Sequence, residues 1–278
     1  MSGQALAIVM VIASGVATYL MSVSTLEALQ ETRARYYEEY AFADVFGSLT
    51  RAPRTLGDRI AEIPGVGTVA GRVVAAAQID VPDFPDPVVG HLVSVPESGQ
   101  PLLNRIHLRR GRMIEPWRDD EILVSEAFAS AHGLLPGDQL SAVIKGTRKK
   151  LNIVGVALSP EYIYQIAPGR ILPDFKRYAV IWMGHRALAA AYEMEDAFNS
   201  VTLGLAADAN ADTVIERLDV LLEPYGGLGA YDREDQISHR FLNEEFEQLR
   251  QTSGLFSAIF LAVTAFLLNV VVARLVNT

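Results

Sequence analysis

The sequence predicts an α+β membrane protein in which two transmembrane helices flank a mixed α/β extracytoplasmic domain. Three observations lead to this fold class. Two long apolar runs without acidic residues lie near the two ends of the 278-residue chain. All 33 Asp and Glu residues, and 23 of the 24 Lys and Arg residues, lie between these runs. Within that charged segment, alternating β patterns are interspersed with short helical ones.

The first apolar run, Ala5 to Val23, contains no charged residue. About 20 such residues in a helix cross the hydrocarbon core of a bilayer. A cleaved signal peptide is the alternative, but no basic segment precedes the run, as such a peptide requires. We therefore expect residues 1–26 to form a first transmembrane helix. No helix breaker follows, and Leu29 and Arg33 continue it as an amphipathic stalk.

The second apolar run, Gly254 to Val276, has Arg274 as its only charged residue. A buried core helix is the alternative, but the length and the near absence of charge favour a transmembrane helix at 254–278. Upstream, apolar residues recur at helical spacing, and only Ser253 and Gly254 lie at the join. We predict one continuous helical rod. Its candidate coupling residues are Phe241, Phe246, Leu249 and Gly254.

Charge also orients the chain in the membrane. Basic residues near a span favour the cytoplasmic side, and Arg274, near the end of the second run, is the base closest to either span. We therefore expect both spans in the plasma (inner) membrane, with the domain between them extracytoplasmic or periplasmic. Its acidic balance argues against nucleic acid as a partner, and the absence of cysteine fits an exported domain.

Residues 27–100 are predicted to hold the stalk and the first half of a split α+β subdomain. Ala43–Leu49 alternates like a strand, and Thr55–Ile63 reads as a short helix that ends at Pro64-Gly65. Two further β candidates follow. They are Thr68–Ile79, which leads to Val81, and Val88–Val95.

Residues 198–253 are predicted to hold the second half of this subdomain and the stalk helix. The same order of elements returns there, with a strand at Ser200–Leu205 and a helix at Ala211–Leu222. Two strand-helix halves this far apart indicate one subdomain that is interrupted by an insert.

The insert, predicted at residues 101–197, is rich in β patterns. A strand at Glu121–Val124 precedes a short helix that Ser125 caps and Gly133 ends. Gln139–Ile144 and Lys150–Leu158 then form a hairpin. The loop that follows is rich in apolar and aromatic side chains, which form either a contact surface or ordinary core. These candidate contact residues are Tyr162, Ile163, Tyr164, Ile166, Phe175 and Tyr178.

Motifs of catalysis are not found in the sequence. There is no GxxxxGK[ST] loop for a nucleotide phosphate and no GxSxG nucleophile elbow. The five histidines lack metal-ligand spacing. The basic cluster Arg109–Arg112 is followed closely by Glu115 and Asp119–Glu121, which favours local ion pairs over an anion site. We expect no catalytic, cofactor-binding or metal-binding residues and no enzymatic activity of the chain by itself.

Three segments together resemble a known family. They are Gly111-Arg112, DDEILVSEAFASAHGLLPGDQL (Asp119 to Leu140) and LNIVGVALSPE (Leu151 to Glu161), and Phe266 to Thr278 is similar to the end of the family's second span. The chain resembles permease subunits of ABC transporters of the MacB/FtsX type, which include the lipoprotein-releasing permeases. The likeness covers the first span, the extracytoplasmic domain and the second span. In that family the split subdomain is called Porter-like and the insert Sabre, and the permeases have at least four spans, so the resemblance implies that this chain is a fragment.

The resemblance implies transport by mechanotransmission. A separate ATP-binding cassette ATPase drives the cytoplasmic ends of the helices, and the helices carry that motion to the outer domain. The implied partners are that ATPase, a second permease chain in a dimer, and an extracytoplasmic adaptor or substrate protein; no cofactor is implied. Family members act on lipoproteins, antibiotics or peptides, or control cell-wall hydrolases.

Two other classes of protein fit the same layout. A two-span transmembrane receptor also places a ligand-binding α/β domain between two helices. A membrane-tethered enzyme would do so as well, but the sequence lacks a catalytic constellation. The nested insert and the three segments favour the permease over the receptor.

Overall fold

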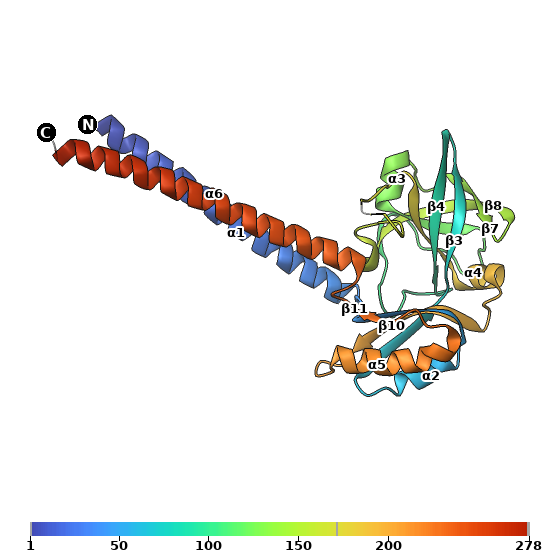
Figure 1. Cartoon of the computed structure of the whole chain (residues 1–278). Helices are drawn as coiled ribbons and strands as arrows, with labels where there is room; N and C mark the ends of the chain where they lie inside the picture. The colour runs from blue at the N-terminus through green and yellow to red at the C-terminus, as the bar shows by residue number, and fades with distance from the viewer. Residues whose placement is uncertain (1, 171, 277–278) are drawn as a thin grey trace. The chain divides into compact units, whose positions relative to one another are not determined.

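The structure, a computed structural model, describes residues 2–170 and 172–276 (Figure 1). Contacts divide the chain into two units. One unit contains the helical segments before Tyr37 and after Arg240, and the other comprises Tyr37–Arg240.

The first unit consists of two long helices, α1 (Ser2–Glu39) and α6 (Ile237–Val276), whose outer parts lie side by side (Figure 1). Phe260 packs against Gly15, where an added Cβ would lie 3.3 Å from the Phe260 Cβ atom. Nearer the other end, the Arg33 guanidinium lies 4.8 Å from the centre of the Phe246 ring. The two helices therefore form an antiparallel pair along their length.

The predicted continuity of the C-terminal helix is confirmed. α6 passes through Ser253 and Gly254 without a break. Within the part of the chain that the structure describes, one stretch, Ile237–Phe266, is long and apolar enough to cross a membrane by length and composition. The first span therefore stays a prediction, although residues 2–26 are helical; residue 1 of that prediction lies outside the described residues.

A four-stranded antiparallel sheet lies in the second unit. Its order is β11-β1-β10-β2, with bounds β1 Val45–Pro53, β2 Val66–Arg72, β10 Ala197–Leu205 and β11 Tyr231–Asp232. Helices α2 (Leu56–Ala61) and α5 (Ala211–Leu222) pack against one face through Ile60, Val201 and Leu218. Since β1 pairs with β10, the two strand-helix halves meet in one sheet, as the sequence predicts.

A seven-stranded sheet forms the rest of the second unit, in the order β5-β8-β6-β9-β4-β3-β7. Because β8 also pairs with β7, six of its strands close into a ring, which leaves few free sheet edges. Two helices accompany it, α3 (Glu126–His132) and α4 (His185–Tyr192). The strand bounds are β3 Val74–Val81, β4 Phe84–Val95, β5 His107–Gly111, β6 Glu121–Ser125, β7 Gln139–Ile144, β8 Thr147–Leu158 and β9 Tyr178–Gly184.

The boundary between the two sheets differs from the predicted division at residue 101. The chain leaves the four-stranded sheet at Arg72 and enters the seven-stranded one at Val74. The predicted strand Thr68–Ile79 is therefore two strands in different sheets. Alternation shows that residues are extended but carries no information about the partner strand. Consequently, residues 74–100 belong structurally with the insert.

Local turn signals in the insert are confirmed. Gly133 ends α3 in the left-handed conformation, with φ 68°. The hairpin turn is tighter than predicted and consists of Lys145 and Gly146, both with positive φ as a two-residue turn requires. Ser125 occupies the N-cap position of α3, but its hydroxyl donates to Gln165 Oε1 at 2.8 Å instead of capping the helix.

Candidate functional site

A cleft of about 1110 Å³ lies in the second unit, between elements of the two sheets. One wall comes from β2 and the start of α2, and the other from the end of β4 and the start of α4. Its lining mixes apolar side chains such as Trp182 with polar ones such as Arg54 and His185. Arg72 and Glu161 also line this cleft.

Arg72 and Glu161 form an ion pair that is largely buried. Two guanidinium nitrogens of Arg72 donate to the two carboxylate oxygens of Glu161, each at 2.5 Å. Glu161 also accepts from Asn104 Nδ2 at 2.8 Å, and Arg72 Nε donates to Ser200 Oγ at 3.2 Å. Burial alone would lower the pKa of Arg72, but the facing carboxylate raises it, so the guanidinium stays charged.

His91 and Tyr162 lie next to this pair and are held in their neutral forms. His91 Nε2 lies 3.1 Å from the Tyr162 hydroxyl. Burial lowers the pKa of His91 to about 4 and raises the pKa of Tyr162 well above its usual value. Neither group is therefore poised to exchange a proton near neutral pH. Among the described residues, no three His, Asp or Glu side chains are grouped to hold a metal ion.

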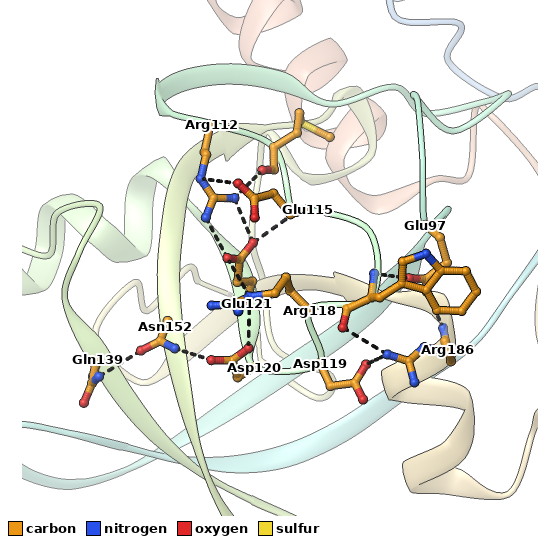
Figure 2. A network of polar contacts seen from close by, with 12 residues as sticks. Glu97, Arg112, Glu115, Arg118, Asp119, Asp120, Glu121, Gln139, Asn152 and Arg186 are labelled. Atoms are coloured by element: carbon orange, nitrogen blue, oxygen red, sulfur yellow. Dashed lines mark hydrogen bonds and ion pairs between the residues drawn. The ribbon is translucent and has the colours of Figure 1, made fainter.

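The basic cluster Arg109–Arg112 forms local ion pairs, as predicted. Arg112 donates to both carboxylate oxygens of Glu121, at 2.6 and 2.8 Å, and Arg109 pairs with Glu126 at 3.1 Å. Arg118 also pairs with Glu121, with its Nε atom 3.4 Å from Oε1 (Figure 2). The Glu121 side chain is only 3% exposed. The hydrogen bonds from Arg112 lower the pKa of Glu121 to about 2.

The loop between β5 and β6, which contains Trp117 and Asp119, is bonded to α4 through Arg186 (Figure 2). Arg186 Nη2 donates to Trp117 O at 3.1 Å and to Asp119 Oδ1 at 2.5 Å. Its guanidinium lies 5.1 Å from the centre of the Trp117 ring. These contacts hold Trp117 at φ 68°, a conformation that large side chains rarely adopt.

The depressed pKa of Glu121 predicts a specific loss of stability in acid. The carboxylate stabilises the fold above its ordinary pKa of 4.5, and this contribution is lost as the pH falls towards 2. Glu121→Gln should therefore lower the free energy of unfolding at pH 7 by about 2–3 kcal/mol and flatten its dependence on pH between 4.5 and 2. Urea unfolding of the detergent-solubilised chain at several pH values measures both effects.

The matched control is Glu115→Gln. Glu115 pairs with Arg112 at 3.6 Å, but its side chain is 59% exposed, so little stability should be lost. An unchanged acid dependence in Glu121→Gln would show that the ion pairs around Glu121 contribute nothing to stability.

The six candidate contact residues do not form one exposed surface. Ile166 and Tyr178 are both buried, at 6% exposure, and Tyr178 packs with Val180 and Trp182 inside the seven-stranded sheet. Of the six, only Phe175 is exposed. Tyr162, Ile163 and Tyr164 are half-buried. The core alternative therefore accounts for this loop better than a shared contact surface does.

The four candidate coupling residues all lie on α6. Phe246 lies beneath Arg33 of α1, and Leu249 is 47% exposed. Phe241 is half-buried, and a Cβ added to Gly254 would meet no atom within 4 Å. Their role in coupling stays a prediction.

Sequence reasoning missed the partners Arg72 and Glu161. Glu161 ended one of the three segments that carry the family resemblance, but Arg72 is 89 positions earlier in the chain. One signal was present, because Arg72 is the only charged residue in the predicted strand Thr68–Ile79. A buried arginine in a strand requires an anionic partner, but local sequence does not say which one.

Comparison with known proteins identifies no family model and no curated protein that matches this chain. Solved structures that are similar to it include the following three. The periplasmic region of MacB from Actinobacillus actinomycetemcomitans is 9% identical, with 78% of this chain and 98% of that one covered at a TM-score of 0.43. The extracellular domain of the noncanonic ABC-type transporter YknZ from Gram-positive bacteria is 11% identical, with 68% and 98% covered at a TM-score of 0.41.

The third structure is a domain of a permease protein from Porphyromonas gingivalis. It is 13% identical, with 67% of this chain and 85% of that one covered at a TM-score of 0.38.

Proposed function

We propose that this chain is part of the permease subunit of an ABC transporter that works by mechanotransmission. In this proposal, the chain lies in the plasma (inner) membrane with Glu27–Ser253 outside the cytoplasm. A separate ATP-binding cassette subunit hydrolyses ATP and moves the cytoplasmic ends of α1 and α6. Motion of the outer domain then exports or releases a substrate. The three sequence segments that resemble MacB/FtsX-type permeases are the basis of this assignment.

The observation that carries the mechanical part is the continuity of α6. Its 40 residues form one helix about 60 Å long, which is longer than a bilayer is thick. The helix includes the apolar stretch and a charged stalk, with no proline and no turn between them. A helix without a hinge transmits displacement along its axis, whereas a flexible linker would absorb it.

The contacts between α1 and α6 support the same reading. Arg33 donates a hydrogen bond to Asn243 Oδ1 and stacks on the Phe246 ring, so the two stalks are joined beyond the apolar runs. Two helices that are joined in this way resist bending more than either helix alone. We infer that they move as a pair.

Reconstitution with the ATPase tests the proposal. The intact protein and a candidate ATP-binding cassette subunit from the same organism are placed together in liposomes. We expect a stable complex in which the rate of ATP hydrolysis depends on the permease. The absence of any complex or of any effect on hydrolysis would rule out the assignment.

The chain by itself should neither bind nor hydrolyse ATP, because its sequence has no phosphate-cradling loop. Isothermal titration calorimetry of the detergent-solubilised chain with Mg²⁺ and ATP should show no binding heat. The complex with the ATPase subunit, titrated in the same buffer, is the positive control. Binding by the chain alone at micromolar affinity would contradict the division of labour between two subunits.

A two-span receptor is the second candidate, and the cleft is the observation that favours it. A space of about 1110 Å³ with mixed polar and apolar lining is large enough for a small molecule. A receptor would signal without an ATP-binding cassette partner. The reconstitution therefore separates the two candidates.

A further inference from the structure

Two short segments of the second unit connect the outer domain with its long helices. One segment, residues 40–43, follows α1, and it is hydrogen-bonded to the loop between β4 and β5. The backbone nitrogen of Asn104 donates to Ala41 O at 2.8 Å, and Asn104 Oδ1 accepts from Ala43 N at 2.9 Å. The next residue, Arg105, donates its backbone nitrogen to Tyr40 O at 2.8 Å.

The other segment, residues 236–239, opens α6 and is bonded to the loop that follows β8. Gln236 Nε2 donates to the Glu161 carbonyl oxygen at 2.8 Å, and Tyr164 N donates to Ser238 Oγ at 2.9 Å. Gln236 and Ser238 are buried, at 5% and 0% exposure. Both segments are thus held by loops of the insert rather than by solvent-exposed contacts.

Glu161 joins these two sets of contacts to the four-stranded sheet. Its carboxylate accepts from Asn104 Nδ2 and from both terminal nitrogens of Arg72, which lies at the end of β2. Its own carbonyl holds Gln236. Glu161 therefore contacts segment 236–239 through its carbonyl oxygen, reaches segment 40–43 through Asn104, and binds the four-stranded sheet through Arg72. We call the residues Arg72, Asn104, Glu161 and Gln236 the Glu161 junction.

We propose that Glu161 is a positioning residue that holds the two sheets, together with the connecting segments bonded to its loop, as one body. A bidentate arginine–carboxylate contact fixes both distance and angle, which a single hydrogen bond does not. Separating the partners would leave a charge unpaired in a largely buried site, so the junction resists opening. The mechanical use of this rigidity rests on the proposed function, but the rigidity itself does not.

Distance measurements between the two sheets test the proposal in the full chain. The protein has no cysteine, so Lys150→Cys on β8 and Glu216→Cys on α5, both at exposed positions, can be spin-labelled without background. Double electron–electron resonance should give one narrow distance distribution. Glu161→Gln keeps an acceptor for Asn104 but loses the bidentate pair, and it should at least double the width of the distribution. The control Glu193→Gln, at an ion pair whose carboxylate is 80% exposed, should leave the width unchanged.

A second variant separates positioning from simple stabilisation. Arg72→Met with Glu161→Met replaces the pair by apolar side chains, which removes the buried charges but supplies no directional contact. We expect its thermal stability to return towards the unmodified chain while the distance distribution stays broad. A narrow distribution in this double variant, or in Glu161→Gln, would overturn the proposal. If Glu161→Gln does not fold, the double variant decides the question.

The outcome is distinguishable from failure of the proposed function. If the protein forms no complex with an ATPase but Glu161→Gln broadens the distribution, the permease assignment fails and the junction stands. If the intact permease transports and Glu161→Gln changes neither the distribution nor transport, the junction proposal fails alone.

Discussion

Inserting two glycines after Thr252 is expected to abolish transport by the intact permease while its ATPase subunit continues to hydrolyse ATP. The insertion lies within α6, between the stalk and the apolar stretch. Each glycine costs about 1 kcal/mol of helix propensity relative to alanine, so the helix gains a flexible point. The two residues also rotate the following segment by about 200° relative to the stalk. Transport and ATP hydrolysis are measured together in liposomes.

Two substitutions nearby serve as controls. Gly254→Ala raises helix propensity at a position where an added Cβ meets no atom within 4 Å, so transport should continue. Leu249→Ala removes a half-exposed side chain without breaking the helix, so its effect should be mild. Transport at the unmodified rate by the double-glycine variant would show that α6 is only a tether, and the mechanical proposal would be wrong.

Gly155→Val is expected to destabilise the outer domain by at least about 3 kcal/mol, or to prevent folding. A Cβ at Gly155 would lie 2.6 Å from the carbonyl oxygen of Arg112 and 2.8 Å from side-chain atoms of Leu108 and Leu123. In β8 this residue lies opposite Gly111 of β5, so neither strand carries a side chain where they approach. Urea unfolding followed by tryptophan fluorescence measures the loss.

Gly57→Ala is the matched control for this substitution. Gly57 lies in α2, where an added Cβ meets no atom within 4 Å, so the midpoint of unfolding should be unchanged or slightly raised. If Gly155→Val and the unmodified chain unfold at the same urea concentration, β5 and β8 can move apart at this point without loss of stability, and the prediction is wrong.

The glycine also explains one of the segments on which the family resemblance rests. In LNIVGVALSPE, the glycine is required where β8 meets β5, and the final glutamate closes the Glu161 junction. The sequence marked both residues only as parts of a similar segment. Their separate physical reasons became clear once β5, β8 and β2 were placed together.

The sequence alone determined the features of this protein that depend on neighbouring residues. The confinement of charge between two apolar runs predicted the helices at both ends. Gly133 predicted the end of α3, and the closely spaced bases and acids between Arg109 and Glu121 predicted ion pairs. Such features follow from the order of residues along the chain and do not depend on which distant segments meet, so a sequence pattern is enough to predict them.

Only the tertiary structure decided how distant segments share the core. The chain passes from one sheet to the other at Val73, β8 pairs with β7, and Arg72 pairs with Glu161. Each of these contacts joins parts of the chain that local patterns treat as independent. The tertiary structure also decides burial. The sequence is compatible with Tyr178 at the surface or in the core, and the place of β9 in its sheet buries this side chain. Strand partners and buried charge pairs are selected by the packing of the whole domain, and no local pattern of residues contains that information.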